Sequence, residues 1–216
     1  PTNNKKTGFA IIEYKYGDQS MWEAENNLAD SALWGEAAAE NPFIGRERCI
    51  AEYYLDKDEK PVLSHETGYA SLKRFYNENG FLMGEACYDK TGAPAYCTGY
   101  GVSKILYEYS EIGNRTCDQY FDINDEPINR LDTGYARIYR EYEMGKKVKE
   151  YYEGCKEGML CAVSDKQTGV AIIKYSYNNG QRTEESYYDI NQKLVLHSEL
   201  GCAKQKYEYE NGKVCR

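Results

Sequence analysis

The residues from Gly169 to Asp189, GVAIIKYSYNNGQRTEESYYD, determine the expected fold of this chain. Apolar or tyrosine side chains stand two, four, six and eight residues after Gly169, which is the period of a half-buried β-strand. Asn179-Gly180 follows, and this pair tolerates the positive φ angles of a type I′ turn between two alternating runs. An aromatic pair and an acid end the stretch. The pattern therefore predicts an antiparallel β-hairpin.

The same pattern recurs along the chain with a period of about 33 residues. Each copy starts at a glycine, continues with an apolar residue and then Ala or Ser, and has a tyrosine eight residues after the glycine. The glycines are Gly8, Gly68, Gly101, Gly134, Gly169 and Gly201, and the tyrosines are Tyr16, Tyr76, Tyr109, Tyr142, Tyr177 and Tyr209. We therefore expect a single repeat domain over 1–216. Its units are 8–67, 68–100, 101–133, 134–168 and 169–200, with a half unit at 201–216.

A polar turn and a short extended segment complete each unit. The second strand ends on an aromatic or apolar pair and an acid, as in Tyr120-Phe121-Asp122, and the chain then reaches Pro61, Pro94 or Pro127. Proline is tolerated at the start of an edge strand, so a third, short strand is the expectation for this segment. We expect a mainly β fold, in which antiparallel hairpins stack into an elongated, twisted array. A closed, propeller-like β-ring is the alternative, because the first and last strands could pair.

An insertion interrupts the first hairpin between Tyr16 and Cys49. Ser20-Met21-Trp22-Glu23 has the form of a capping box, which satisfies backbone N–H groups at a helix start. Residues that favour helix follow as far as Asn41-Pro42. We therefore predict an inserted helix over about 20–45 that caps the open end of the stacked core; a functional insertion is the alternative.

Composition and charge exclude several classes of partner. The chain has 23 Tyr against 5 Phe and 2 Trp, and tyrosine suits half-buried strand positions where the ring packs and the hydroxyl reaches water. A net charge of −8 repels phosphate backbones and anionic lipid, so nucleic acid is not an expected partner. No apolar stretch approaches the length of about 18 residues that predicts a membrane span. The start at Pro1 predicts a processed chain or part of a longer one.

The remaining reactive residues favour structural roles. The eight cysteines stand mostly at different unit positions, which predicts thiols for most of them, with some disulfides as the alternative and Cys155–Cys161 as a candidate local pair. Only His65 and His197 occur and no CxxC is present, so a zinc site is not expected. No phosphate-binding loop or nucleophile motif appears. We therefore predict a protein that is not an enzyme and has no cofactor.

Acidic turns offer a weak alternative as calcium sites. Asp56 and Asp58, and likewise Asp122 and Asn124, have the spacing that begins a Ca²⁺ loop, but the later glycine and bidentate acid are missing. Asp and Asn also stabilise turns by accepting hydrogen bonds from their own backbone two residues on. Turn formation is the favoured interpretation, and no metal site is predicted.

The chain after the insertion resembles tandem tyrosine-rich repeats of gut Firmicutes proteins, which have the form Gly-Tyr-Ala, Tyr-x-x-x-Gly-Asn and Tyr-Tyr-Asp-x-x-Gly-x-Pro. Tyr69-Ala70, Tyr109 with Gly113-Asn114, and Pro127 carry this resemblance, and the stretch 207–213 is also similar to YD-type and variant MORN-type repeats. The resemblance implies an accessory or binding module of a bacterial cell envelope or surface, and it supplies no catalytic residues. Cys87 departs from the pattern because it stands where a tyrosine is expected.

Two hypotheses for function follow. In the first, the array binds a cell-envelope glycan or a protein through displayed tyrosines, with Tyr88, Tyr152 and Tyr188 as candidates. In the second, the array is a spacer or assembly element, and its tyrosines form the core. Exposure of the tyrosines eight residues after each glycine distinguishes the two hypotheses.

Overall fold

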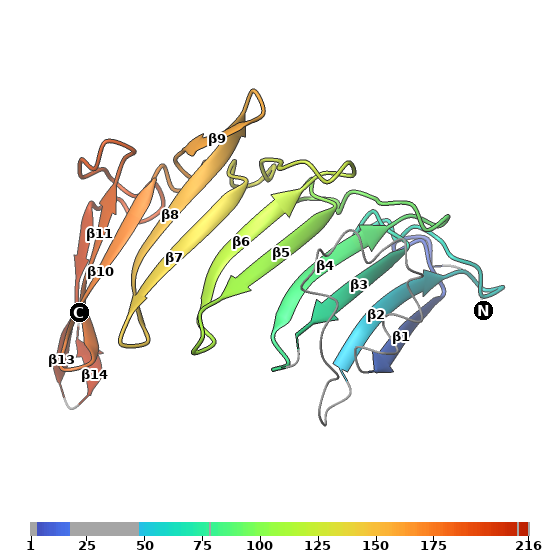
Figure 1. Cartoon of the computed structure of the whole chain (residues 1–216), viewed down its shortest axis with the longest axis horizontal. Helices are drawn as coiled ribbons and strands as arrows, with labels where there is room; N and C mark the ends of the chain where they lie inside the picture. Colours follow the sequence, from blue (N-terminus) through green and yellow to red (C-terminus); the bar gives the residue numbers. More distant parts are fainter. Residues whose placement is uncertain (1–3, 18–47, 78, 211, 216) are drawn as a thin grey trace. The chain divides into compact units, whose positions relative to one another are not determined.

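The computed structural model describes residues 4–17, 48–77, 79–210 and 212–215 (Figure 1). The described chain is mainly β and contains no helix. Its main sheet has 12 strands, and β13 and β14 form a separate pair. The strands are β1 (Ile11–Gly17), β2 (Arg48–Leu55), β3 (Ser71–Tyr76), β4 (Leu82–Tyr88), β5 (Lys104–Tyr109), β6 (Arg115–Phe121), β7 (Arg137–Glu143), β8 (Lys146–Lys156), β9 (Met159–Ala162), β10 (Ile172–Asn178), β11 (Gln181–Tyr188), β12 (Lys204–Lys206), β13 (Glu208–Glu210) and β14 (Lys213–Cys215).

The chain forms two compact units, and the boundary between them runs through β5 and β6. The first unit comprises Pro1–Tyr107 and Tyr120–Glu126, and the second comprises Glu108–Gln119 and Pro127–Arg216. In the first unit, β1 pairs with β2 and β3 pairs with β4, both antiparallel. In the second unit, β7 pairs with β8 and β10 pairs with β11 in the same way. Consecutive strands thus form the hairpins that the sequence pattern predicts.

The main sheet is open in the part of the chain that the structure describes. Its strand order runs from β1 to β12 in sequence order, with β9 paired to β8 beside this path, and β12 does not return to β1. The closed ring considered as an alternative is therefore wrong for the described strands. The predicted helix over about 20–45 lies within 18–47 and is thus outside the described residues.

The hairpin turns follow the prediction in part. Met144-Gly145 and Asn179-Gly180 both have positive φ at each residue, as a type I′ turn requires. The turns at 77–81 and 110–114 are wider, because Asn77 N–H donates to the Phe81 carbonyl and Ser110 N–H to the Asn114 carbonyl. There only the glycines, Gly80 and Gly113, have positive φ among the described residues. An additional residue in each turn allows ordinary φ angles elsewhere.

The predicted third strands are mostly single bridges. Leu55 bridges Pro61, Tyr88 bridges Pro94 and Tyr188 bridges Leu194. The exception is the fourth hairpin, where β8 continues past the usual end and pairs with β9. Gly158 and Glu157 form the turn there, both with positive φ.

Both units bury apolar clusters on their strands, and in the first unit such clusters lie on both faces, because Ala86 and Cys87 are neighbours in β4 and belong to different clusters. In the first unit, Tyr54, Tyr69, Leu72 and Cys87 are buried together, and Phe9 packs against them. In the second unit, the Tyr135 and Tyr152 rings stack with centroids 4.7 Å apart. The first-unit cluster joins two successive hairpins, because Tyr54 lies on β2 and packs against Tyr69 and Leu72 of the following hairpin and its glycine-containing segment.

Candidate binding surface

Four of the tyrosines that stand eight residues after a repeat glycine bond to the neighbouring hairpin. The Tyr142 hydroxyl donates a hydrogen bond of 3.0 Å to the Arg115 carbonyl of β6, and the Tyr177 hydroxyl donates one of 2.9 Å to the Lys147 carbonyl of β8. Tyr76 donates to the Cys49 carbonyl and Tyr209 to the Arg182 carbonyl in the same manner. These tyrosines are half-buried, except Tyr16 on β1, which is 54% exposed. Their hydroxyls are therefore used within the sheet.

A β-bulge lies directly beside several of these tyrosines. The register shifts between Phe75 and Tyr76, between Glu141 and Tyr142, and between Ser176 and Tyr177. A bulge adds a residue to one strand and re-aims the side chains beside it. The constant position of the tyrosine in the sequence thus has a geometric cause.

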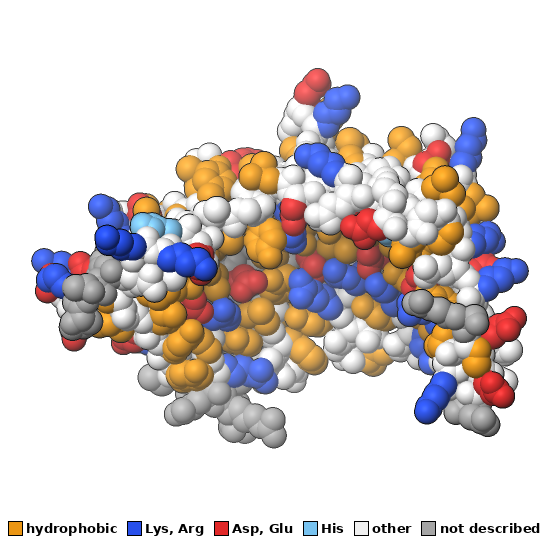
Figure 2. Space-filling model, turned by 180° about the vertical axis from the view of Figure 1, so that it is seen from behind, with side chains coloured by type: hydrophobic (Ala, Val, Ile, Leu, Met, Phe, Trp, Pro, Cys, Tyr) orange, Lys and Arg blue, Asp and Glu red, His pale blue; other side chains and the backbone are white. Residues whose placement is uncertain are grey.

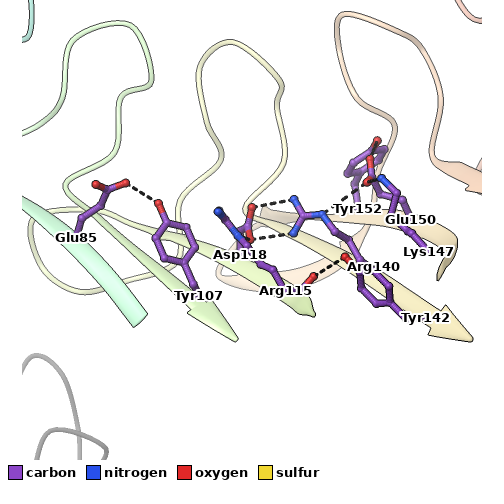
Figure 3. A network of polar contacts seen from close by, with 9 residues as sticks. All are labelled: Glu85, Tyr107, Arg115, Asp118, Arg140, Tyr142, Lys147, Glu150 and Tyr152. Atoms are coloured by element: carbon purple, nitrogen blue, oxygen red, sulfur yellow. Dashed lines mark hydrogen bonds and ion pairs between the residues drawn. The ribbon is translucent and has the colours of Figure 1, made fainter. Parts of the chain in front are cut away.

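A row of acidic side chains crosses the same face of the strands. We call it the acid row; it stands two residues before the buried end of each second strand and consists of Glu52, Glu85, Asp118, Glu150 and Glu185. In the first unit, the Arg74 guanidinium lies 3.7 Å from Glu52 and 3.7 Å from Glu85. The Tyr107 hydroxyl donates a hydrogen bond of 2.5 Å to Glu85 (Figure 3). Two neighbouring acids thus share one arginine.

In the second unit, Asp118 and Glu150 lie on either side of Arg140 (Figure 3). Arg140 donates two hydrogen bonds of 2.9 Å to Asp118, and Arg115 also bonds to this carboxylate. Lys147 and the Tyr152 hydroxyl donate to Glu150 at 2.6 and 2.8 Å. Each acid therefore has both a cation and further donors.

The pKa of Asp118 follows from these contacts. Burial acts to raise it, but the hydrogen bonds and charges of Arg140 and Arg115 outweigh burial and hold the pKa below its usual range. Burial and the neighbouring Glu150 carboxylate raise the pKa of the Tyr152 hydroxyl. Asp118 is thus ionised and Tyr152 neutral. Such mutually compensated charges are not poised for proton transfer.

The three tyrosines predicted as ligand-binding candidates lie in different surroundings. Tyr88 is 2% exposed and Tyr152 is 6% exposed, so both rings are packed inside the protein. Tyr188 is half-buried, and the Lys174 ammonium lies 4.9 Å from its ring centroid. Of the three, only Tyr188 is not fully buried. Tyr88 belongs to a core cluster with Ile50, Phe75 and Ala86, so its ring is not available to a ligand.

The aspartate carboxylates of the acidic turns accept hydrogen bonds from the backbone N–H groups of the same turn. Asp122 Oδ1 accepts the N–H groups of Asn124 and Glu126, and Asp56 Oδ1 accepts those of Asp58 and Lys60. These backbone donors lower the pKa of the Asp56 carboxyl. Across the described residues, no group of three His, Cys, Asp or Glu side chains is arranged to hold a metal ion. The geometry therefore supports turn formation and gives no support to the calcium alternative.

The eight cysteines are thiols in the structure. The candidate pair Cys155–Cys161 is wrong, because Cys155 opposes Leu160 and Cys161 opposes Gly154, which places the two cysteines on opposite faces of the β8–β9 pair. A hydrogen bond with the Cys97 thiol, together with burial, raises the pKa of the Cys87 thiol. Cys87 is thus a poor nucleophile and behaves as a core residue.

Some exposed apolar side chains, such as Ile112 and Met144, lie in the turns between the two strands of a hairpin, and a larger group lies in the turns and loops that follow the second strands. We call this larger group the loop-side apolar residues. In the first unit they are Leu63, Tyr96, Tyr100 and Ile123, and in the second unit Leu131, Ile190, Leu194, Leu196 and Leu200. Leu131 and Leu196 are 68% and 66% exposed. Figure 2 shows apolar side chains along its upper edge, where the loops of Figure 1 lie, and mixed basic and acidic side chains in the middle of the face.

Comparison with known proteins does not assign a family. No family model matches the chain, and no curated protein matches it significantly. Among the described residues, no helix is long and apolar enough to cross a membrane. The functional assignment therefore rests on the chain's own geometry.

The tyrosine pattern of the sequence does not predict the acid row. Its signal was present, since an acid recurs at a fixed distance before the residue that ends each second strand. The loop-side apolar residues also recur in part, since Leu63, Tyr96 and Leu196 each stand five residues before a repeat glycine. The repeat pattern does not show that these side chains are exposed, and the structure does.

Proposed function

We propose that this chain is a non-catalytic β-hairpin repeat module that binds a protein partner through the loop-side apolar residues. The observation that carries the proposal is the exposure of these side chains in loops, where binding residues commonly lie on a rigid scaffold. The sheet supplies that scaffold through its paired strands and tyrosine hydrogen bonds. An extended repeat array, of the kind that the sequence resembles, would present these loops repeatedly.

A glycan-binding aromatic row is the less favoured function. The repeat tyrosines are half-buried, and the four that donate to a neighbouring carbonyl hold their rings against the sheet. Sugar recognition by stacking needs an accessible ring face. A glycan array probed with the whole chain tests this alternative directly, and specific hits would favour it over a protein partner.

Site-specific photo-crosslinking tests the proposed surface. A benzophenone amino acid is placed at Leu131 or Leu196, and the protein is irradiated in the cells that produce it. We expect a discrete protein adduct from these positions. The matched control carries the same residue at Lys174, whose ammonium lies over Tyr188 on the sheet and not in the loops. Equal adducts from Lys174, or none from either loop position, would contradict the proposal.

A further inference from the structure

The second strand of one hairpin lacks a buried ring that the others have. At the position of Cys87, the other hairpins have tyrosine, and these residues are Tyr54, Tyr120, Tyr152 and Tyr187. The positions are equivalent in space as well, because the carbonyls of Cys87, Tyr54 and Tyr187 each accept an N–H from the short segment after the strand. All four tyrosines are buried, with exposures of 2 to 6%. A ring at this position is thus a regular part of the core.

A cavity of about 130 Å³ lies against Cys87 in the first unit. Its apolar wall includes Tyr69, Leu72, Cys87, Tyr100, Val102 and Ile105. A dry, apolar cavity of about 150 Å³ is large enough to bind benzene. The space beside Cys87 therefore has the size of one aromatic ring, and the small thiol in place of a tyrosine accounts for it.

The cavity also contains the acceptor that such a ring uses elsewhere in the protein. Tyr152 and Tyr187 donate their hydroxyls to the acid two residues earlier, Glu150 and Glu185, at 2.8 and 2.9 Å. The corresponding acid is Glu85, which lines the cavity. Glu85 already accepts the Tyr107 hydroxyl, but a carboxylate has about four lone-pair sites and can accept a second donor.

We propose that this cavity binds a free phenol. The ring of the ligand replaces the missing tyrosine ring between Leu72, Val102 and Ile105, and its hydroxyl donates to Glu85. The occupant is a single-ring molecule because the volume is that of one ring. Of the loop-side apolar residues the cavity includes only Tyr100, and neither Leu131 nor Leu196, the two positions used to test the partner surface, belongs to its walls.

Methyl-labelled protein titrated with phenol provides the direct test. We expect saturable shifts and nuclear Overhauser contacts from the phenol ring to the methyls of Leu72, Val102 and Ile105, and none to Ile138. Toluene lacks the hydroxyl and should bind about fivefold more weakly, because it cannot donate to Glu85. N-acetyltyrosinamide tests for a tyrosine of a partner chain. Its binding without that of phenol would overturn the assignment to a free ligand.

Two variants locate the site. Cys87→Tyr supplies the ring that the other hairpins carry, so it should abolish the phenol contacts while the circular dichroism spectrum stays that of the wild type. Cys161→Tyr adds the same ring at an exposed position and should leave phenol binding unchanged. Unchanged phenol binding by a folded Cys87→Tyr variant, or contacts to methyls elsewhere in the wild type, would refute the proposal. The contacts in the wild type decide the question even if Cys87→Tyr does not fold.

Discussion

At the scale of single residues, tyrosine and glycine carry most of the constraint. Four of the tyrosines eight residues after a repeat glycine donate their hydroxyls to a backbone carbonyl of the preceding hairpin. Each repeat glycine adopts a positive φ between 67° and 83°, a region that other residues rarely adopt. Both residue types recur because the backbone geometry requires them.

Removing one tyrosine hydroxyl should weaken the sheet measurably. Tyr142→Phe keeps the ring and loses the donor to the Arg115 carbonyl, so we expect the free energy of unfolding in urea to fall by about 1 kcal/mol. Tyr16→Phe is the control, since Tyr16 is 54% exposed and its hydroxyl can bond to water. Equal losses in the two variants would show that the hydrogen bond to β6 does not stabilise the fold.

Alanine substitutions at two glycines distinguish the cost of backbone strain from the cost of steric conflict. Gly68 has φ +82°, and a Cβ there would meet the side chain of Thr98 and come within 3.3 Å of its backbone nitrogen. Gly92 has φ +86°, and a Cβ there would meet nothing within 4 Å. We expect Gly92→Ala to cost about 1 kcal/mol of unfolding free energy from strain alone. Gly68→Ala should cost about 1 to 2 kcal/mol more because the loop of the next hairpin must move. Chemical denaturation of both variants measures the difference.

At the scale of the strands, the acid row links neighbouring hairpins through charge. Asp118 on β6 is 5% exposed at its side chain and accepts both guanidinium hydrogen bonds of Arg140 on β7. An acid on one hairpin and a cation on the next thus stabilise the pairing of their strands. Removal of one partner alone lowers stability, because the charge of the other partner then remains buried without compensation.

Asp118→Asn should therefore destabilise the second unit by about 3 kcal/mol. Glu141→Gln removes an exposed pair with Lys149 and should cost less than about 0.5 kcal/mol.

The lowered pKa of Asp118 makes its contribution to stability depend on pH. Its stabilisation is complete above the unfolded pKa of about 3.9 and is lost as the pH falls through the lower folded value. Urea titrations at pH 7 and pH 3 should show that the difference in unfolding free energy between Asp118→Asn and the wild type is smaller at pH 3. A difference that is as large at pH 3 as at pH 7 would contradict this.

The strands themselves were largely predictable from the sequence, and the turns were less so. Alternation from Gly169 to Tyr177 predicted β10, and Asn179-Gly180 predicted its type I′ turn. The same reasoning failed at Asn79-Gly80, because a hydrogen bond between Asn77 and Phe81 closes a wider turn. Turn width depends on which backbone groups pair, and the Asn-Gly pair alone does not determine it.

At the scale of the whole molecule, buried hydroxyls and thiols make stability sensitive to alkaline pH. Burial and the neighbouring Glu52 raise the pKa of Tyr54 to about 12, and burial raises that of Cys117 to about 12. Groups with a raised folded pKa stabilise the protein fully below their unfolded pKa values. For tyrosine and cysteine these are about 10 and 8.5, and the stabilisation is lost as the pH rises through the folded values.

We therefore expect cooperative unfolding between pH about 10 and pH about 12. Far-ultraviolet circular dichroism and tyrosinate absorbance at 295 nm should change together in one transition. The same titration in concentrated urea gives the unfolded reference, with tyrosine ionising earlier. Gradual ionisation in water at the pH of the urea reference, without loss of β signal, would contradict the burial of these side chains.

The sequence by itself determined the hairpins, their boundaries and the residues that must be glycine or tyrosine, because these follow from local periodicity and backbone sterics. Tertiary structure alone decided which tyrosines are accessible and how the acids pair, since both depend on contacts between strands some 20 to 30 residues apart, such as the 22-residue separation of Asp118 and Arg140. It also revealed the space beside Cys87, which a sequence shows only as a substitution. A missing ring becomes a cavity only when the surrounding residues are held apart by the fold.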